Sequence, residues 1–247
     1  MLFNYLLQLA DNQLILSQRL SELCGHGPAL EQDIALTNIS LDLIGQARLL
    51  FQYAEKLDDK KRNEDQLALV RAENEYRNVL LVEQPNVDFA HVIVRQYFYD
   101  EFNYLNYSAL VNSKDETLAA IATKSLMEVK YHRRFSRNWL LRLGDGTAIS
   151  NQKMQNAVNN LWAYPGELFV MTAEERILVK ADIAVDVSAF KQSWEDAVKA
   201  ALTEATLTIP EGTWHQTGGK KGIHSEHLGH ILSEMQFLQR TYPNLTW

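Results

Sequence analysis

Residues 116–143 read ETLAAIATKSLMEVKYHRRFSRNWLLRL. Apolar and aromatic side chains such as Tyr131 and Phe135 recur in this stretch at the spacing of one helix face. Glu128 and His132 lie four residues apart in the middle of that apolar arc, so both are predicted to point toward the core. The opposite side of the same predicted helix carries a basic stripe of Lys130, Arg133, Arg134 and Arg137.

Three more segments, residues 3–24, 30–57 and 88–112, have the same helical periodicity and a similar length. Four long helices in the first 143 residues indicate an antiparallel bundle. No hairpin signal flanked by alternating strands is present. The sequence therefore predicts one all-α domain over residues 1–247, with a core bundle at 1–143 and accessory helices at 144–247. Between prolines and glycine-containing turns, shorter helices are predicted at residues 65–81, 150–162, 170–181, 188–206 and 225–240.

Each of the other long helices also places polar side chains within its apolar arc, namely Gln13, Asp42, Gln46 and Glu101. Burying such groups costs several kcal/mol unless they pair with one another, with water or with a metal. A polar layer across the bundle is therefore expected. Di-iron carboxylate bundles have such a layer, in which two helices each supply a Glu-x-x-His pair.

The sequence contains no Glu-x-x-His. Its nearest formal match is the segment Asp88-Phe89-Ala90-His91, which begins just after Pro85. A carboxylate in that position is typical of a helix N-cap. We therefore interpret Asp88 as the cap of the helix at 88–112.

The composition excludes several classes of protein. The 247 residues carry a net charge of -7, which disfavours bulk binding to nucleic acid. Cys24 is the only cysteine, so an internal disulfide and a cysteine-ligated zinc or iron–sulfur site are excluded; it is expected in the core.

The most apolar run, residues 89–111, contains three charged residues, so no membrane span is predicted. The first basic residue is Arg19, which argues against a leader and for a cytoplasmic protein.

Two further features near the C-terminus carry candidate binding residues. The loop Thr217–Gly222 contains Lys220 and Lys221 and precedes a predicted helix, an arrangement found at anion sites, although a packing turn or an interface with a partner is the simpler interpretation. The residues His224, His227 and His230 repeat every third position, so a mononuclear metal site is conceivable. Helix capping and contacts to a partner are the simpler roles for these histidines.

Seven stretches resemble the C-subunit family of the bacterial phenylacetyl-CoA epoxidases: residues 18–20, 24–26, 41–48, 80–86, 95–98, 131–136 and 217–229, which read QRL, CGH, LDLIGQAR, LLVEQPN, RQYF, YHRRFS and TGGKKGIHSEHLG. The resemblance extends from about Leu7 to Trp247. It implies a ferritin-like fold and a place in a multicomponent oxygenase of aerobic phenylacetate degradation. In that family a homologous A subunit holds the di-iron centre that inserts one oxygen atom into the aromatic ring of phenylacetyl-CoA.

The same resemblance implies how the work is divided among the components. A separate reductase carries FAD and an iron–sulfur centre and draws electrons from NADPH. The C subunit is a structural partner that binds and supports the A subunit and carries no cofactor of its own. A cytoplasmic hetero-oligomer is therefore expected.

The resemblance also places the six ligand positions of a di-iron bundle on this chain. One Glu-x-x-His pair falls on Leu43 and Gln46, and the other falls on Val129 and His132. The remaining two carboxylates fall near Gln13 and Glu101, so only Glu101 and His132 keep a usable ligand. Asp42 and Glu128 precede two of the lost positions, but their side chains point about 100° away. The layer is therefore predicted to be a hydrogen-bonded remnant.

Two alternatives remain open from the sequence. In the first, Asp42, Glu101, Glu128 and His132 bind iron, and the chain is an oxygenase in its own right. In the second, the chain is a binding module for CoA esters, because arginine pairs well with phosphate. The candidate docking residues, for CoA or for an acidic partner, are Lys130, Arg133, Arg134, Arg137, Lys220 and Lys221.

Overall fold

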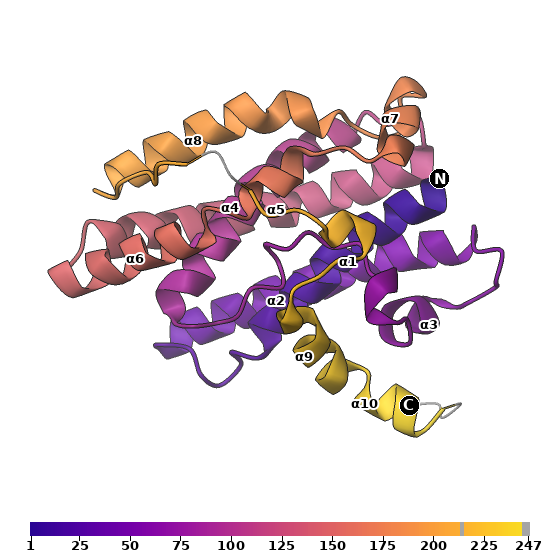
Figure 1. Cartoon of the computed structure of the whole chain (residues 1–247), viewed down its shortest axis with the longest axis horizontal. Coiled ribbons are helices and arrows are strands. Elements are labelled where there is room, and N and C mark those ends of the chain that lie inside the picture. Colours follow the sequence, from indigo (N-terminus) through magenta and orange to yellow (C-terminus); the bar gives the residue numbers. More distant parts are fainter. Residues whose placement is uncertain (213–214, 244–247) are drawn as a thin grey trace. The chain divides into compact units, whose positions relative to one another are not determined.

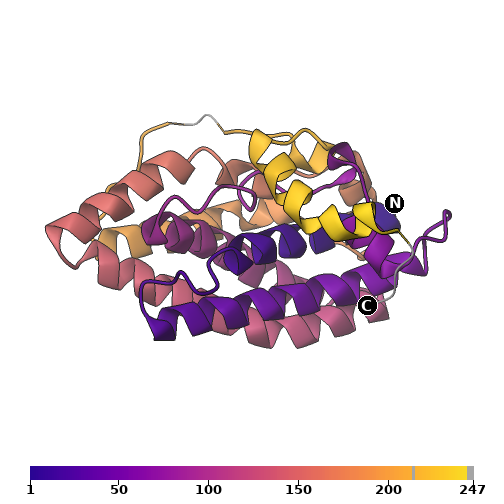
Figure 2. The same ribbon diagram turned by 90° about the horizontal axis from the view of Figure 1, so that it is seen from below.

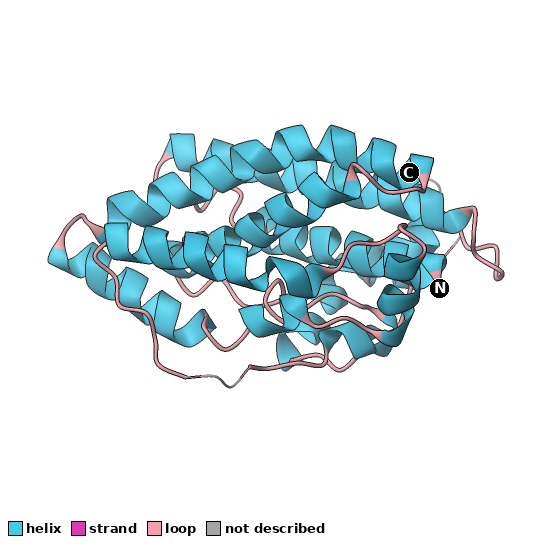
Figure 3. Ribbon diagram, turned by 90° about the horizontal axis from the view of Figure 1, so that it is seen from above, coloured by secondary structure: helices cyan, strands magenta, loops and turns pink. Residues whose placement is uncertain are grey.

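A computed structural model describes residues 1–212 and 215–243. The chain divides into two compact units, one formed by Met1–Pro85 with Gly218–Trp247 and the other by Asn86–Thr217. Figure 1 labels the helices of both units. Every regular element in the described residues is a helix, and none of these residues forms a strand (Figure 3). The predicted all-α class is therefore confirmed.

The first unit is built on two long helices, α1 and α2, that lie side by side (Figure 2). The chain reverses between them in an eight-residue connection, so the pair is antiparallel. The later α9 packs against α1 and returns the end of the chain to this unit. The elements of the unit are α1 (Leu2–Ser21), α2 (Leu30–Glu55), α3 (Glu64–Leu69), η1 (Glu73–Glu75), η4 (Gly219–Lys221), α9 (Glu226–Met235) and α10 (Phe237–Thr241).

The second unit is built on the antiparallel pair α4 and α5, and α6 and α8 pack against both. Asp88 caps α4 by accepting a hydrogen bond from the backbone N–H of His91 at 2.9 Å, which confirms its predicted role. The indole N–H of Trp194 donates to the carbonyl of Phe98 at 2.9 Å and fixes α8 on α4. The elements are α4 (Phe89–Leu110), α5 (Glu116–Gly144), α6 (Ala148–Leu161), η2 (Pro165–Phe169), α7 (Ala173–Lys180), η3 (Val187–Phe190) and α8 (Lys191–Glu204).

The helix predicted at 65–81 is wrong beyond Leu69, where α3 ends. The chain that follows is irregular apart from the short η1, and side chains of α1 accept two of its backbone hydrogen bonds. The backbone N–H of Arg77 donates to the carboxylate of Asp11 at 2.8 Å, and that of Val79 donates to the Asn12 side chain at 2.8 Å. Because these buried N–H groups have side-chain acceptors, the segment does not need helical hydrogen bonds. The helix predicted at 225–240 is likewise divided into α9 and α10.

The buried face of α5 differs from the predicted one. Residues Val129 and His132 are buried, but Tyr131 is 40% exposed and Glu128 is only half-buried. The sequence pattern was misleading because Tyr131, on the outer surface of α5, has the guanidinium group of Arg134 over its ring, 5.8 Å from the centroid. The predicted burial of Cys24 is also wrong, since this residue lies exposed in the turn after α1.

Candidate functional site

A cluster of buried polar side chains joins α4 and α5 within the second unit. The carboxylate of Asp100 accepts hydrogen bonds from Gln96 Nε2 at 2.7 Å and from Ser136 Oγ at 2.8 Å. Burial raises the pKa of Asp100 to about 6, although the charge of His132 and the two hydrogen bonds act in the opposite direction. The cluster therefore contains a carboxyl group that titrates near neutral pH.

Glu101 lies next to Asp100 on α4 and has a cationic partner on α5. The Nε atom of Arg133 donates to Glu101 Oε2 at 2.6 Å, and the Glu101 side chain is only 3% exposed. The Arg133 guanidinium also lies over the Tyr104 ring, 4.4 Å from its centroid. Burial alone would lower the pKa of Arg133, but the hydrogen bond and charge of Glu101 raise it. The two side chains therefore form a largely buried pair between α4 and α5.

The sequence identified only part of this cluster. It predicted polar roles for Glu101 and His132, and it missed Asp100, Gln96 and Ser136. Two i, i+4 relationships carried the missing signal, because Gln96 precedes Asp100 by four residues and Ser136 follows His132 by four. The apolar residues of α4 lie on one face of the helix, and the sequence predicted burial for that face alone. Asp100 and Gln96 lie on other faces of α4, and these are buried too.

The remaining residues of the predicted polar layer are distributed over both units. Two of the ligand positions are occupied by apolar residues, Leu43 and Val129, each 0% exposed. Gln13 on α1 and Gln46 on α2 are buried amides. Asp42 and Glu128 are half-buried. Within residues 1–212 and 215–243, no three His, Cys, Asp or Glu side chains come together in a group able to hold a metal ion.

The basic stripe of α5 is only partly available to a ligand. Arg133 is turned toward Glu101, as described above, and Arg137 pairs with Glu204 of α8 at 2.5 Å. Lys130 and Arg134 are exposed. The predicted set of four docking cations is therefore reduced to two that carry no ion pair with α4 or α8.

A second buried network closes the first unit around Glu83 and His224. The ring of His224 lies 3.0 Å from Glu83 Oε2 through Nδ1 and 3.1 Å from the carbonyl of Tyr76 through Nε2. Burial would lower the pKa of His224, but the hydrogen bond and charge of Glu83 raise it. Glu83 also accepts from the backbone N–H of Ser225 at 2.7 Å and from Asn78 Nδ2 at 2.9 Å.

This network involves both of the C-terminal features that the sequence offered as candidate binding sites. Both ring nitrogens of His224 already face oxygen acceptors, so this histidine does not offer a lone pair to a metal beside His227 and His230. The loop around Gly219 packs tightly against the chain that follows α3, because a Cβ on Gly219 would overlap the backbone of Asn78. Lys220 is buried in this turn, and Lys221 is exposed.

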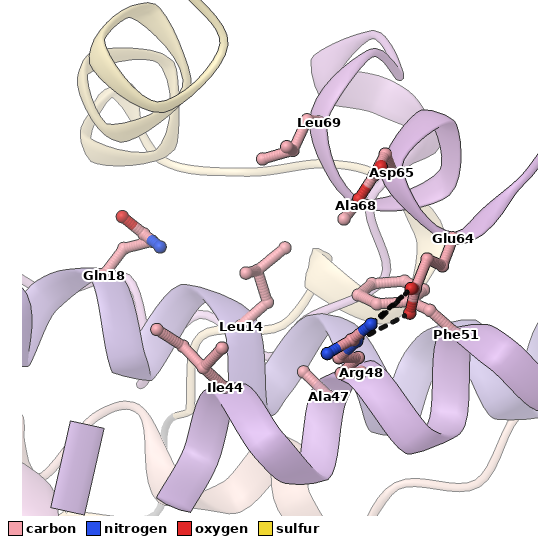
Figure 4. A pocket seen from close by; sticks show the side chains of 10 residues that line it. All are labelled: Leu14, Gln18, Ile44, Ala47, Arg48, Phe51, Glu64, Asp65, Ala68 and Leu69. Atoms are coloured by element: carbon pink, nitrogen blue, oxygen red, sulfur yellow. Dashed lines mark hydrogen bonds and ion pairs between the residues drawn. The ribbon is translucent and has the colours of Figure 1, made fainter. Parts of the chain in front are cut away.

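A groove with a mainly apolar lining lies between α1, α2 and α3 (Figure 4). Its volume is about 210 Å³. At its rim Arg48 of α2 pairs with Glu64 of α3 at 3.1 Å, and Asp65 stands beside this pair. The apolar lining residues are Leu14, Ile44, Ala47, Phe51, Ala68 and Leu69.

Comparison with known proteins gives two consistent matches. The sequence model of the family described as "Phenylacetic acid catabolic protein" matches residues 1–247. The chain is also 51% identical over 243 residues to the C subunit of the 1,2-phenylacetyl-CoA epoxidase of Escherichia coli (strain K12), and the match covers 98% of each protein. The chain therefore belongs to the phenylacetic acid catabolic protein family, a family of ferritin-like helical proteins.

Proposed function

We propose that the chain is a non-catalytic structural component of a phenylacetyl-CoA epoxidase. It binds and supports the di-iron A subunit in the cytoplasm during aerobic phenylacetate degradation. The proposal starts from the similarity to the C subunit of such an epoxidase along almost the whole chain. Its distinctive part, the absence of a catalytic role, depends on the chemistry of the residues at the ligand positions.

The observation that carries this part is the burial of Leu43 and Val129 at positions where a metal-binding relative has glutamates. Both side chains are fully buried and hydrocarbon, so neither position can supply an anionic oxygen. Two irons need several carboxylates to balance their charge. The buried amides of Gln13 and Gln46 are neutral and add no charge. The donor set therefore does not fit a di-iron centre.

The surviving carboxylate has a different use. Arg133 is the counter-ion of Glu101, and its guanidinium group is permanently positive. Asp100, buried between Gln96 and Ser136, adds a second link between α4 and α5. These contacts hold the two helices in a fixed register without a metal, which suits a protein that supports another protein.

In this proposal the cofactors belong to other components of the complex. The di-iron centre lies in the A subunit, and NADPH, FAD and the iron–sulfur centre belong to the reductase. The alternative of a CoA-ester module gains no support from α5, because Arg133 and Arg137 already have carboxylate partners.

Two measurements on the full chain test the proposal. The first is the iron content of the protein purified alone and treated with ferrous iron in air, with the A subunit treated in parallel as a control. We expect substoichiometric iron here and a filled site in the control; two irons per chain would make this protein an oxygenase. The second is binding of the A subunit, and absence of a complex would overturn the supporting role.

A further inference from the structure

The outer face of α2 exposes large apolar side chains. Leu30, Ile34 and Leu41 are 70%, 51% and 60% exposed. With Gly45 and Arg48 they lie within about 60° of one another around the helix, because their spacing follows the helical repeat. This outer face, defined by Leu30, Ile34, Leu41, Gly45 and Arg48, runs along more than half of the helix. A solvated helix face normally carries charged and polar residues instead.

The hydropathy of α2 as a whole also indicates that apolar surface faces outward. Among the described residues, α2 alone is long and apolar enough to resemble a membrane-spanning helix, yet less than half of its most apolar window is buried inside the protein. A core helix of similar hydropathy would hide its apolar surface within its own chain. The apolar surplus of α2 therefore faces outward.

Gly45 has no explanation within the chain. It lies in the interior of α2, where glycine is among the least favourable residues for a helix. A Cβ at this position would meet no atom within 4 Å, so no internal contact requires its absence. Glycine on a helix face allows the backbone of another element to approach closely. Its position among exposed apolar residues indicates that such an element comes from outside the chain.

The groove between α1, α2 and α3 continues this face. Ile44, next to Gly45, belongs to its lining, and the lining is mainly apolar (Figure 4). Two acidic residues, Glu64 and Asp65, stand at its rim with one cation, Arg48. A large apolar side chain flanked by Lys or Arg would complement both the lining and the rim charge.

We propose that the outer face of α2 and the adjoining groove dock a helix of the A subunit, one that carries large apolar side chains with Lys or Arg beside them. This inference rests on the proposed function and names the surface that performs it. A second copy of the chain fits less well, because each copy has a net charge of -7 and the same acidic rim. An anionic membrane is also disfavoured by that rim.

The test uses a change that the monomer can accommodate. Gly45→Trp adds a bulky side chain in open space on the outer face, so folding is expected to remain intact by circular dichroism and thermal unfolding. The matched control is Ala200→Trp, at an exposed position of α8. Binding of the purified A subunit to each full-length variant is measured by titration. We expect Gly45→Trp to weaken binding at least about tenfold, as at an interface hot spot, and Ala200→Trp to leave it unchanged.

A second variant and four other outcomes make the result decisive. Leu41→Glu, which places a charge in the same face, is expected to weaken binding to a similar extent. If the A subunit binds the wild type and both α2 variants equally, the surface is wrong and the proposed function stands. If it does not bind the wild type, the proposed function itself fails. Self-association that Gly45→Trp abolishes, or flotation of the wild type with anionic vesicles, would assign the face to another occupant and overturn the inference.

Discussion

The guanidinium of Arg133 on α5 donates from Nε to Oε2 of Glu101 on α4 over 2.6 Å, and the carboxylate is only 3% exposed. A buried carboxylate requires a nearby positive charge or a proton. In a metal-binding bundle the metal supplies that charge, whereas here a side chain of the neighbouring helix supplies it. The pair therefore explains how one acidic residue of the polar layer is retained in a protein proposed to hold no iron.

Removing this cation is predicted to destabilise the second unit. Arg133→Met leaves the charge of Glu101 buried without its partner, and we expect a loss of about 1–3 kcal/mol, since the Arg133 side chain itself is partly exposed. Chemical denaturation measures the effect. The control Arg134→Met removes an exposed arginine of the same helix and is expected to change stability by less than about 0.5 kcal/mol. In a Glu101→Gln background Arg133→Met should cost less; an equal cost would mean that the pair contributes nothing.

Asp100 predicts how stability depends on pH. Its pKa is about 6 in the folded protein and near 3.8 when unfolded, so between these values the folded state holds a proton that the unfolded state has lost. Stability from this group is therefore present at low pH and is lost as pH rises toward 6, by about 3 kcal/mol in total. Asp100→Asn removes the titration. We expect the variant to gain stability relative to the wild type between pH 4 and pH 7.

The measurement is denaturant unfolding of both proteins across that pH range, with the exposed Asp59→Asn as the control. The difference between variant and wild type cancels the contribution of titrating groups that the substitution leaves unchanged, such as His224 of the first unit. A difference that stays constant with pH would contradict the raised pKa.

The irregular chain after α3 depends on Asp11. This carboxylate is fully buried, and it accepts from the Arg71 guanidinium and from the backbone N–H of Arg77. Asp11→Asn leaves Arg71 charged without its counter-ion, so we expect a loss of about 3–5 kcal/mol. Limited proteolysis should also cut residues 70–85 faster, whereas the exposed Glu73→Gln should behave as wild type. Unchanged cleavage would mean that Asp11 does not hold this segment.

The long helices could be predicted from the sequence because each of them repeats apolar residues over many turns. The error after Leu69 has a physical reason: the acceptors that replace helical hydrogen bonds, Asp11 and Asn12, lie more than 60 residues away in sequence. Helical periodicity describes only local spacing, so it carries no information about such distant partners.

The candidate site was likewise predicted only in part. The resemblance predicted ligand positions at Leu43 and Val129, and the structure shows both side chains to be fully buried. The pairing of Arg133 with Glu101 was missed, because the position of Arg133 on the wheel assigns it to a solvated stripe. A long arginine side chain can reach sideways to a neighbouring helix, and the wheel records only where its Cβ points.

Substitution by alanine is expected to have opposite effects on stability at Gly45 and at Gly219. Gly45 lies in a helix with open space around its Cβ position, so Gly45→Ala should stabilise the isolated chain by about 0.5–1 kcal/mol through helix propensity. Gly219 lies in the turn before α9, where a Cβ would overlap the carbonyl oxygen of Asn78, so Gly219→Ala should cost about 1–3 kcal/mol as the turn moves away from the Glu83 network. Thermal unfolding of the two variants separates internal from external constraint. If Gly45→Ala destabilised the isolated chain, the glycine would be required by its own fold, and it would no longer support an outside partner at α2.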